Sequence, residues 1–199
     1  MKRILVTLTA VAVSALTMYG QSRVNFNNYV SGNAITVGTD NMGATGGAAG
    51  ANLGANYSVQ LLYAAGTFAD LNAFLAANPS SSTPVAFFGA TGGSPGTDGA
   101  GLFDGGTVAF GGAAGTYSAL ARAWYNGGQY STYSAASGAG ANAGQSALFT
   151  IAATSAPTPP PNTTFGSFTV GTTVIVPEPS TIVLAGLGIA SLLLFRRRK

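Results

Sequence analysis

Short runs of β-branched and aromatic residues, separated by clusters of glycine, asparagine and serine, fill the middle of this chain. β-branched and aromatic side chains favour strands, whereas glycine, asparagine and serine favour turns. The runs with strand length are residues 24–30, 34–37, 57–63, 85–88, 107–110, 118–125, 147–151, 165–170 and 172–176. Their number and spacing predict an all-β domain, an antiparallel β-sandwich or jelly-roll-like fold, over residues 23–175. One stretch, residues 69–77, has helical spacing and predicts a short connecting helix.

Segments of low complexity separate these runs. Residues 38–54, 89–101 and 134–145 are rich in glycine, alanine, asparagine and serine, and they predict long mobile loops. Residues 156–164 contain four prolines and predict a polyproline-like stretch. Both a linker and a connection to one more strand fit that stretch.

The residue types that the chain lacks exclude several kinds of chemistry. There is no cysteine and no histidine, and the only lysines are Lys2 and Lys199. A thiol nucleophile, a Ser-His-Asp triad, a zinc site with histidine or cysteine ligands and a Schiff-base or P-loop lysine within the domain are therefore absent. We expect no enzymatic activity, no cofactor and no metal centre.

The charged residues are segregated along the chain. The net charge is +3, but six of the eight basic residues lie at the two ends. Between these ends the sequence contains two basic residues, Arg23 and Arg122, and five acidic residues, four aspartates and one glutamate. This part of the sequence therefore has a net charge of −3. A domain with this balance cannot neutralise a run of phosphates, so nucleic acid is not an expected partner.

The N-terminal segment has the three parts of an export signal. Lys2 and Arg3 precede an uncharged apolar stretch over residues 4–18, and small residues follow it. This order is typical of a secretory signal peptide, which we assign to residues 1–22. Cleavage after Gly20 and cleavage after Ser22 both fit, and the expected partners are signal peptidase and the export machinery.

The C-terminal segment contains a proline-rich motif, an apolar stretch and a basic end. Residues 176–180 read Val-Pro-Glu-Pro-Ser and precede an apolar stretch over residues 181–195. As a helix this stretch rises about 22 Å, less than the hydrocarbon thickness of about 30 Å, which predicts a short single transmembrane helix. The chain then ends on four cations, Arg196, Arg197, Arg198 and Lys199. Cations of this kind stay on the cytoplasmic side, which places the body outside.

This three-part arrangement resembles the PEP-CTERM sorting signal of exopolysaccharide-producing Gram-negative bacteria, an element also grouped as an ice-binding protein C-terminal domain. The matching positions are Pro177, Glu178 and Pro179, with the apolar span and the basic tail. The resemblance implies an exosortase, a membrane-embedded transpeptidase-like enzyme, as partner. It also implies a transient inner-membrane anchor, removal of residues 176–199 in whole or part, and delivery to the cell surface or outside. More loosely, the body resembles other secreted PEP-CTERM proteins in its VNFNN and RAW elements, which imply no activity.

The segment 118–125 holds the strongest candidate for a ligand site. Strand alternation places Arg122 and Trp124 on one face and Tyr125 on the other. Arg122 has two structural interpretations, a cation–π pair with the only tryptophan and an ion pair with an aspartate. The third interpretation is a sugar-stacking platform of Arg122, Trp124, Tyr125 and Tyr130.

Two aspartates in a glycine-rich stretch, Asp98 and Asp104, resemble part of a calcium loop. Such a loop needs six to eight oxygen ligands, and Ala100 and Leu102 occupy ligand positions here. We therefore predict turns in which each aspartate accepts a hydrogen bond from its own backbone. A pair of glycosidase carboxylates is the alternative.

These features predict an exported structural protein of the cell surface or extracellular matrix. Its low charge and its serine, threonine and asparagine content suit a neutral, glycosylated component of an extracellular polymer or biofilm. The alternative is a carbohydrate-binding or adhesion module that contacts extracellular polysaccharide through Trp124 and nearby tyrosines.

Overall fold

The computed structural model describes residues 20–38, 48–94 and 98–172, and it is dominated by strands. The prediction of an all-β domain is confirmed. The elements are β1 (Ser22–Asn27), β2 (Thr36–Val37), β3 (Tyr57–Ala65), α2 (Leu71–Ala76), β4 (Ser80–Ser81), β5 (Val85–Ala86), β6 (Asp104–Phe110), β7 (Gly115–Tyr125), α4 (Tyr133–Gly138), β8 (Asn142–Gln145), β9 (Phe149–Ser155) and β10 (Thr169–Thr172).

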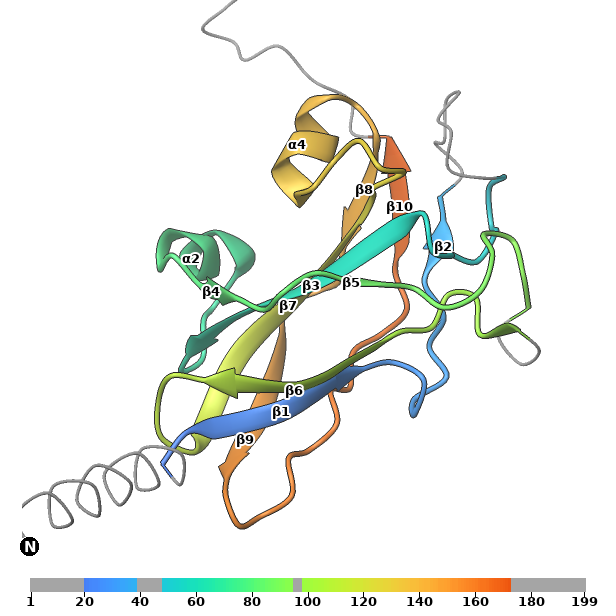
Figure 1. The fold of residues 1–199 in the computed structure, drawn as a ribbon. Coiled ribbons are helices and arrows are strands. Elements are labelled where there is room, and N and C mark those ends of the chain that lie inside the picture. The colour runs from blue at the N-terminus through green and yellow to red at the C-terminus, as the bar shows by residue number, and fades with distance from the viewer. Residues whose placement is uncertain (1–19, 39–47, 95–97, 173–199) are drawn as a thin grey trace, which may run out of the picture.

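The strands form one connected sheet around β7 (Figure 1). Its order is β2-β10-β8-β7-β9-β1-β6, and β3 pairs with β7 outside this path. One edge of β7 pairs with the whole length of β3, while β9 and β8 share the other edge. All strand pairs are antiparallel except β10 with β2. Because β9 also pairs with the start of β1, the sheet continues from the β7 layer into the β1–β6 pair.

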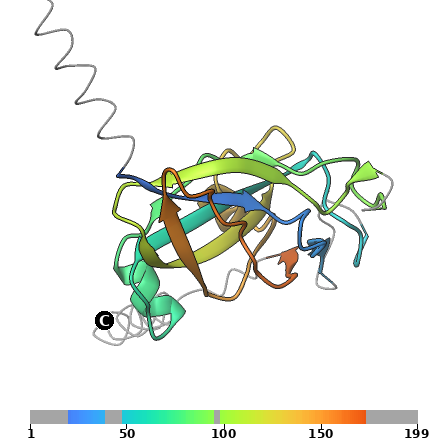
Figure 2. The same ribbon diagram turned by 90° about the horizontal axis from the view of Figure 1, so that it is seen from below.

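The main core lies between these two parts of the sheet. Figures 1 and 2 show β1 and β6 crossing over β3 and β7. Val24 and Phe26 of β1 and Phe110 of β6 pack in one buried cluster with Val59 and Leu61 of β3. The inner face of β7 contributes only small alanines next to its two tyrosines, which lets the two layers approach closely. The narrower assignment to a β-sandwich or jelly roll stays a prediction.

The outer face of β7 is buried as well, because two short helices cover it. Leu120 packs with Phe74 of α2, and Trp124 packs with Ala136 of α4. The predicted alternation along β7 is therefore confirmed. The predicted helix over 69–77 is also confirmed as α2, whose N-cap, Asp70, accepts a hydrogen bond from the Ala73 N–H.

The predicted mobile loop over 134–145 is wrong, because this segment contains most of α4 and the whole of β8. Thr132 caps α4 by accepting a hydrogen bond from the Ala135 N–H. Asn142, which is fully buried, donates from its side-chain amide to the hydroxyl of Tyr57. A Cβ on Gly144 would lie 2.2 Å from the Thr169 carbonyl oxygen, so glycine permits β10 to approach β8. Close backbone approach explains this part of the glycine content.

The proline-rich segment 156–164 belongs to the domain and is not a linker. It lies along the edge of β1 that β6 leaves open, where the Asn25 N–H donates to the Pro161 carbonyl and the Thr163 N–H donates to the Asn25 carbonyl. The Thr163 hydroxyl also donates to the Asn27 carbonyl and is buried. These bonds replace a strand partner and protect this edge of β1 from other chains.

The described strands agree with most of the predicted runs. The exceptions are β4 and β8, which no run predicted, residues 165–168, which are not in a strand, and residues 173–176, which lie outside the described residues. β10 also continues from residue 169 to residue 172, where the runs predicted two separate strands. The predicted transmembrane helix, residues 181–195, and the apolar part of the signal peptide also lie outside them. Within 20–38, 48–94 and 98–172, no helix has the length and hydrophobicity that crossing a membrane requires.

Candidate functional site

The proposed sugar-stacking platform loses its central residue in the structure. Trp124 has 0% exposed surface, and its indole N–H donates to the Tyr130 carbonyl oxygen at 3.0 Å. Tyr130 is half-buried and packs against the same small cluster under α4. A fully covered ring offers no face to a sugar, so the prediction that Trp124 stacks on a ligand is wrong for this structure.

Arg122 has a structural partner that the sequence did not reveal. Its guanidinium carbon lies 4.7 Å from the ring centroid of Tyr133, and its Nε donates to the side-chain oxygen of Gln145 at 3.2 Å. Burial lowers the pKa of Arg122 and raises the pKa of Tyr133. The cation–π pair therefore joins β7 to α4, and it uses Tyr133 instead of Trp124. Predicting it required the helix at 133–138, which the glycine-rich composition concealed.

Tyr125 lies on the opposite face of β7 from Arg122 and Trp124. Its ring contacts that of Tyr57 edge to face, with centroids 5.5 Å apart, at the border of the main core. Burial raises the pKa of Tyr57, whose hydroxyl accepts the hydrogen bond from Asn142. The four predicted platform residues thus share no common surface.

The aspartates form turns, as predicted. Asp98 accepts a hydrogen bond from the Ala100 N–H, and Asp104 accepts one from the Gly106 N–H. Across the described ranges there is no cluster of three or more potential metal-ligating His, Cys, Asp or Glu side chains. Asn28, directly after the end of β1, is structural too. Asn28 accepts from the Phe103 N–H and donates to the carbonyls of Gly101 and Asn33, which joins three segments.

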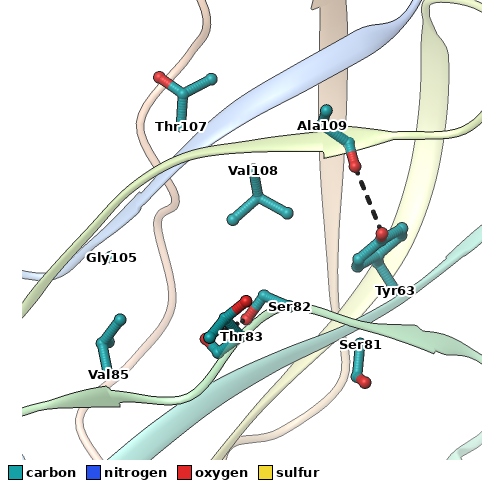
Figure 3. Close-up of a pocket in the computed structure, with 9 residues that line it drawn as sticks. All are labelled: Tyr63, Ser81, Ser82, Thr83, Val85, Gly105, Thr107, Val108 and Ala109. Atoms are coloured by element: carbon teal, nitrogen blue, oxygen red, sulfur yellow. Dashed lines mark hydrogen bonds between the residues drawn. The ribbon is translucent and has the colours of Figure 1, made fainter.

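A cleft that the sequence analysis missed lies between β6 and the chain segment that carries β4 and β5 (Figure 3). It has a volume of about 310 Å³, and none of its lining residues is charged. The lining residues are Tyr63, Ser81, Ser82, Thr83, Val85, Gly105, Thr107, Val108 and Ala109. Figure 3 shows Val108 pointing from β6 toward Ser82 and Thr83 on the opposite wall.

Hydrogen bonds hold both walls of the cleft. On one wall, the Ser82 hydroxyl accepts from the Leu61 N–H and donates to the Thr83 carbonyl. At one end, the Tyr63 hydroxyl donates to the Ala109 carbonyl at 3.3 Å, while the Tyr63 ring stacks on Phe110 at 4.1 Å. Burial raises the pKa of Tyr63. The cleft is thus a formed, uncharged surface depression with hydroxyl groups and two valines.

The start of the described chain bears on the predicted export signal. Ser22 is fully buried, its N–H donates to the Gly112 carbonyl and its hydroxyl donates to that of Tyr117. Ser22 also pairs with Phe110 and Ser155 on its two neighbouring strands. The first residue of β1 is therefore an integral part of the sheet.

The comparisons with known proteins address the C-terminal segment. A family model described as the PEP-CTERM protein-sorting motif matches residues 176–199. No curated protein and no solved structure matches the chain. The matched range contains Pro177, Glu178 and Pro179 and the basic residues of the end, all outside the described residues. Residues 176–199 therefore carry a PEP-CTERM protein-sorting motif, and this motif implies export, transient membrane anchoring and sorting by an exosortase.

Proposed function

We propose that this chain is a non-enzymatic structural protein of the cell surface or extracellular matrix. The observation that carries the proposal is the order of the chain, in which a β-domain reaches Thr172 and a sorting motif begins at residue 176. Only three residues separate the two. The body would therefore leave the membrane as one folded domain once the exosortase acts.

The use of the polar side chains supports a structural role. Asp70 caps a helix, and Asp98 and Asp104 each close a turn. Arg122 joins β7 to α4 through Tyr133 and Gln145. These contacts commit the distinctive side chains to the fold and leave a surface rich in hydroxyl, amide and small apolar groups, with Tyr29, Val30 and Phe88 also exposed, which suits a neutral, hydrated polymer. The carbohydrate-binding alternative is less well supported because Trp124 is buried.

Intact-mass analysis of membrane, matrix and medium fractions tests this proposal in a host that carries an exosortase. Wild type, Glu178→Ala and the neighbouring control Ser180→Ala would be compared. We expect wild type and control in the washed matrix without Arg196–Lys199, and Glu178→Ala in the membrane with its full tail. Full tails in all three proteins would contradict the sorting route. Processed protein found only in free medium would contradict the matrix role.

The same masses locate the N-terminus. Because Ser22 is bonded on both sides in the sheet, we propose that signal peptidase cuts after Gly20, which leaves Gln21 as the first residue. A mature chain that starts at Arg23 would contradict this assignment.

A further inference from the structure

We propose that the cleft between β6 and the β4–β5 segment accepts an extended strand from a second copy of this chain, supplied by residues 173–176. The inference rests on the proposed function, because processing at the motif would leave these residues near the end of the mature chain. It adds a specific contact by which copies of the protein assemble outside the cell.

One wall of the cleft is an unpaired strand edge. β6 pairs with β1 through one edge, and within the described residues no strand pairs with the other. The Ala109 carbonyl points to the cleft, since it accepts the Tyr63 hydroxyl. Residues two apart in a strand direct their N–H and C=O groups to the same side. The N–H and C=O of Thr107 therefore also point to the cleft. This agrees with Asn25, opposite Thr107, whose backbone N–H and C=O bond away from β6 to the proline-rich segment.

The opposite wall is also attached through one side only. β5 pairs with β3 at Val59 and Ser58, β4 pairs with it at Leu62 and Tyr63, and between them the Ser82 N–H donates to the Leu61 carbonyl. The other side of this segment faces β6 across the cleft. Within the described residues, both segments thus have one side without a strand partner, with Val108 lining the space between them, and an added strand can pair with such an edge.

Hydrogen bonds bridge the two sides of the cleft toward both of its ends. Tyr63 bonds to Ala109 at one end, and beyond the other end the Phe88 N–H donates to the Leu102 carbonyl. The opening is therefore a slot of limited length. Its β6 wall extends from Gly105 to Ala109, which suits a strand of about four residues.

Residues 173–176 have the sequence that this slot requires. They read Thr-Val-Ile-Val, which is uncharged and β-branched throughout, and they follow β10 directly. The slot has no charged lining residue and exposes Val85 and Val108 between hydroxyl groups. Pro177, which follows, has no N–H and would end the added strand.

The chain's own segment is too short to reach its own slot. No residue of β10 lines the cleft, and β8, β7 and β3 lie between β10 and β5 in the sheet. Four extended residues after Thr172 span at most about 14 Å, and they would also have to lie within the slot. Figure 1 shows the C-terminal end of β10 at the top of the molecule and β6 well below it. A second copy must therefore supply the strand.

Single-cysteine variants can test this contact because the chain has no cysteine of its own. Processed Thr83→Cys protein, isotope-labelled, would be mixed with processed Ile175→Cys protein under mild oxidation. The control mixture replaces Thr83→Cys with Thr150→Cys, another exposed threonine, which lies on β9 outside the cleft. We expect a mixed disulfide dimer from the first mixture and its loss in the control. No mixed dimer, or equal yields from both mixtures, would overturn the proposal.

A charge in the donor segment provides a second test. Ile175→Lys would place a cation in an uncharged slot, so we expect sedimentation of the processed variant as a monomer where wild type associates. Wild-type association that survives this substitution would overturn the proposal, as would a wild type that is monomeric throughout. A monomeric but processed protein in the matrix would refute only this inference. A full tail retained in the membrane would refute the proposed function instead.

Discussion

The outer face of β7 and the cleft beside β6 differ in both composition and accessibility. The β7 face holds the only tryptophan and one of the two arginines between the basic ends, and α4 covers both, with Tyr133 of α4 lying against the arginine. The cleft is lined by serine, threonine, valine, alanine and glycine with a single tyrosine, and it is open. The tryptophan is thus fully buried and the arginine half-buried, and the accessible site uses ordinary residues and strand edges.

The difference has a physical cause. A domain whose central strand carries small alanines on its inner face gains little apolar burial per residue there. Large side chains on the other face compensate, and a helix must then cover them. In this chain, the rare residue types, tryptophan and arginine, therefore stabilise the fold and are not evidence of a ligand site.

Among the substitutions that test this difference, Trp124→Ala should have the largest effect on stability. Removal of a fully buried indole leaves a cavity beneath α4 and should lower the free energy of unfolding by about 3–5 kcal/mol. Urea unfolding followed by circular dichroism measures the change. Tyr29→Ala is the control, because Tyr29 is 51% exposed and its loss should cost less than about 0.5 kcal/mol. Equal decreases in the free energy of unfolding for the two variants would contradict the burial of Trp124 beneath α4.

Gly144→Ala would test how closely β10 packs against β8. The added methyl would overlap the Thr169 carbonyl and force β10 away from β8, at a cost of about 1–3 kcal/mol. In the control, Gly111→Ala, the new methyl has no heavy atom within 4 Å. The difference in unfolding free energy between the two variants measures the effect, and a neutral Gly144→Ala would show that β10 is not packed as described.

Two substitutions in the wall of the cleft distinguish a side chain that stabilises the wall from one that only lines its surface. Ser82→Ala removes the acceptor of the Leu61 N–H and should cost about 1 kcal/mol. Thr83→Ala removes an exposed hydroxyl and should change the unfolding free energy by less than about 0.5 kcal/mol. If Thr83→Ala were the more destabilising, the cleft would be a packed part of the fold.

Alkaline pH should give the smallest and broadest effect. Burial raises the pKa of Tyr57, Tyr63 and Tyr133 above the ordinary value of about 10. As pH rises past this value, the unfolded chain loses phenolic protons that the folded chain retains, so the free energy of unfolding falls. Urea unfolding at pH values below and above about 10 measures the decrease. Stability that is constant or increases over this range would contradict the buried placement of these rings.

Local patterns in the sequence predicted the elements that depend on their own residues. Alternation at 118–125 predicted which face of β7 each side chain occupies, and helical spacing predicted α2. The segment with α4 and β8 could not be predicted, because its glycines and alanines are required by contacts with Trp124 and β10, which are distant in sequence. The cleft was missed for the same reason. It exists only where β6 and β5, which do not pair, lie across from each other.

The accessibility of Trp124 tests the central claim, that the distinctive side chains serve the fold, most directly. Because the chain has one tryptophan, its fluorescence reports this residue alone. We expect blue-shifted emission, weak quenching by acrylamide until the protein unfolds in urea, and no change on addition of extracellular polysaccharide. Red-shifted emission that acrylamide quenches strongly in the folded protein, or a spectral shift with polysaccharide, would contradict it and restore Trp124 as a binding residue.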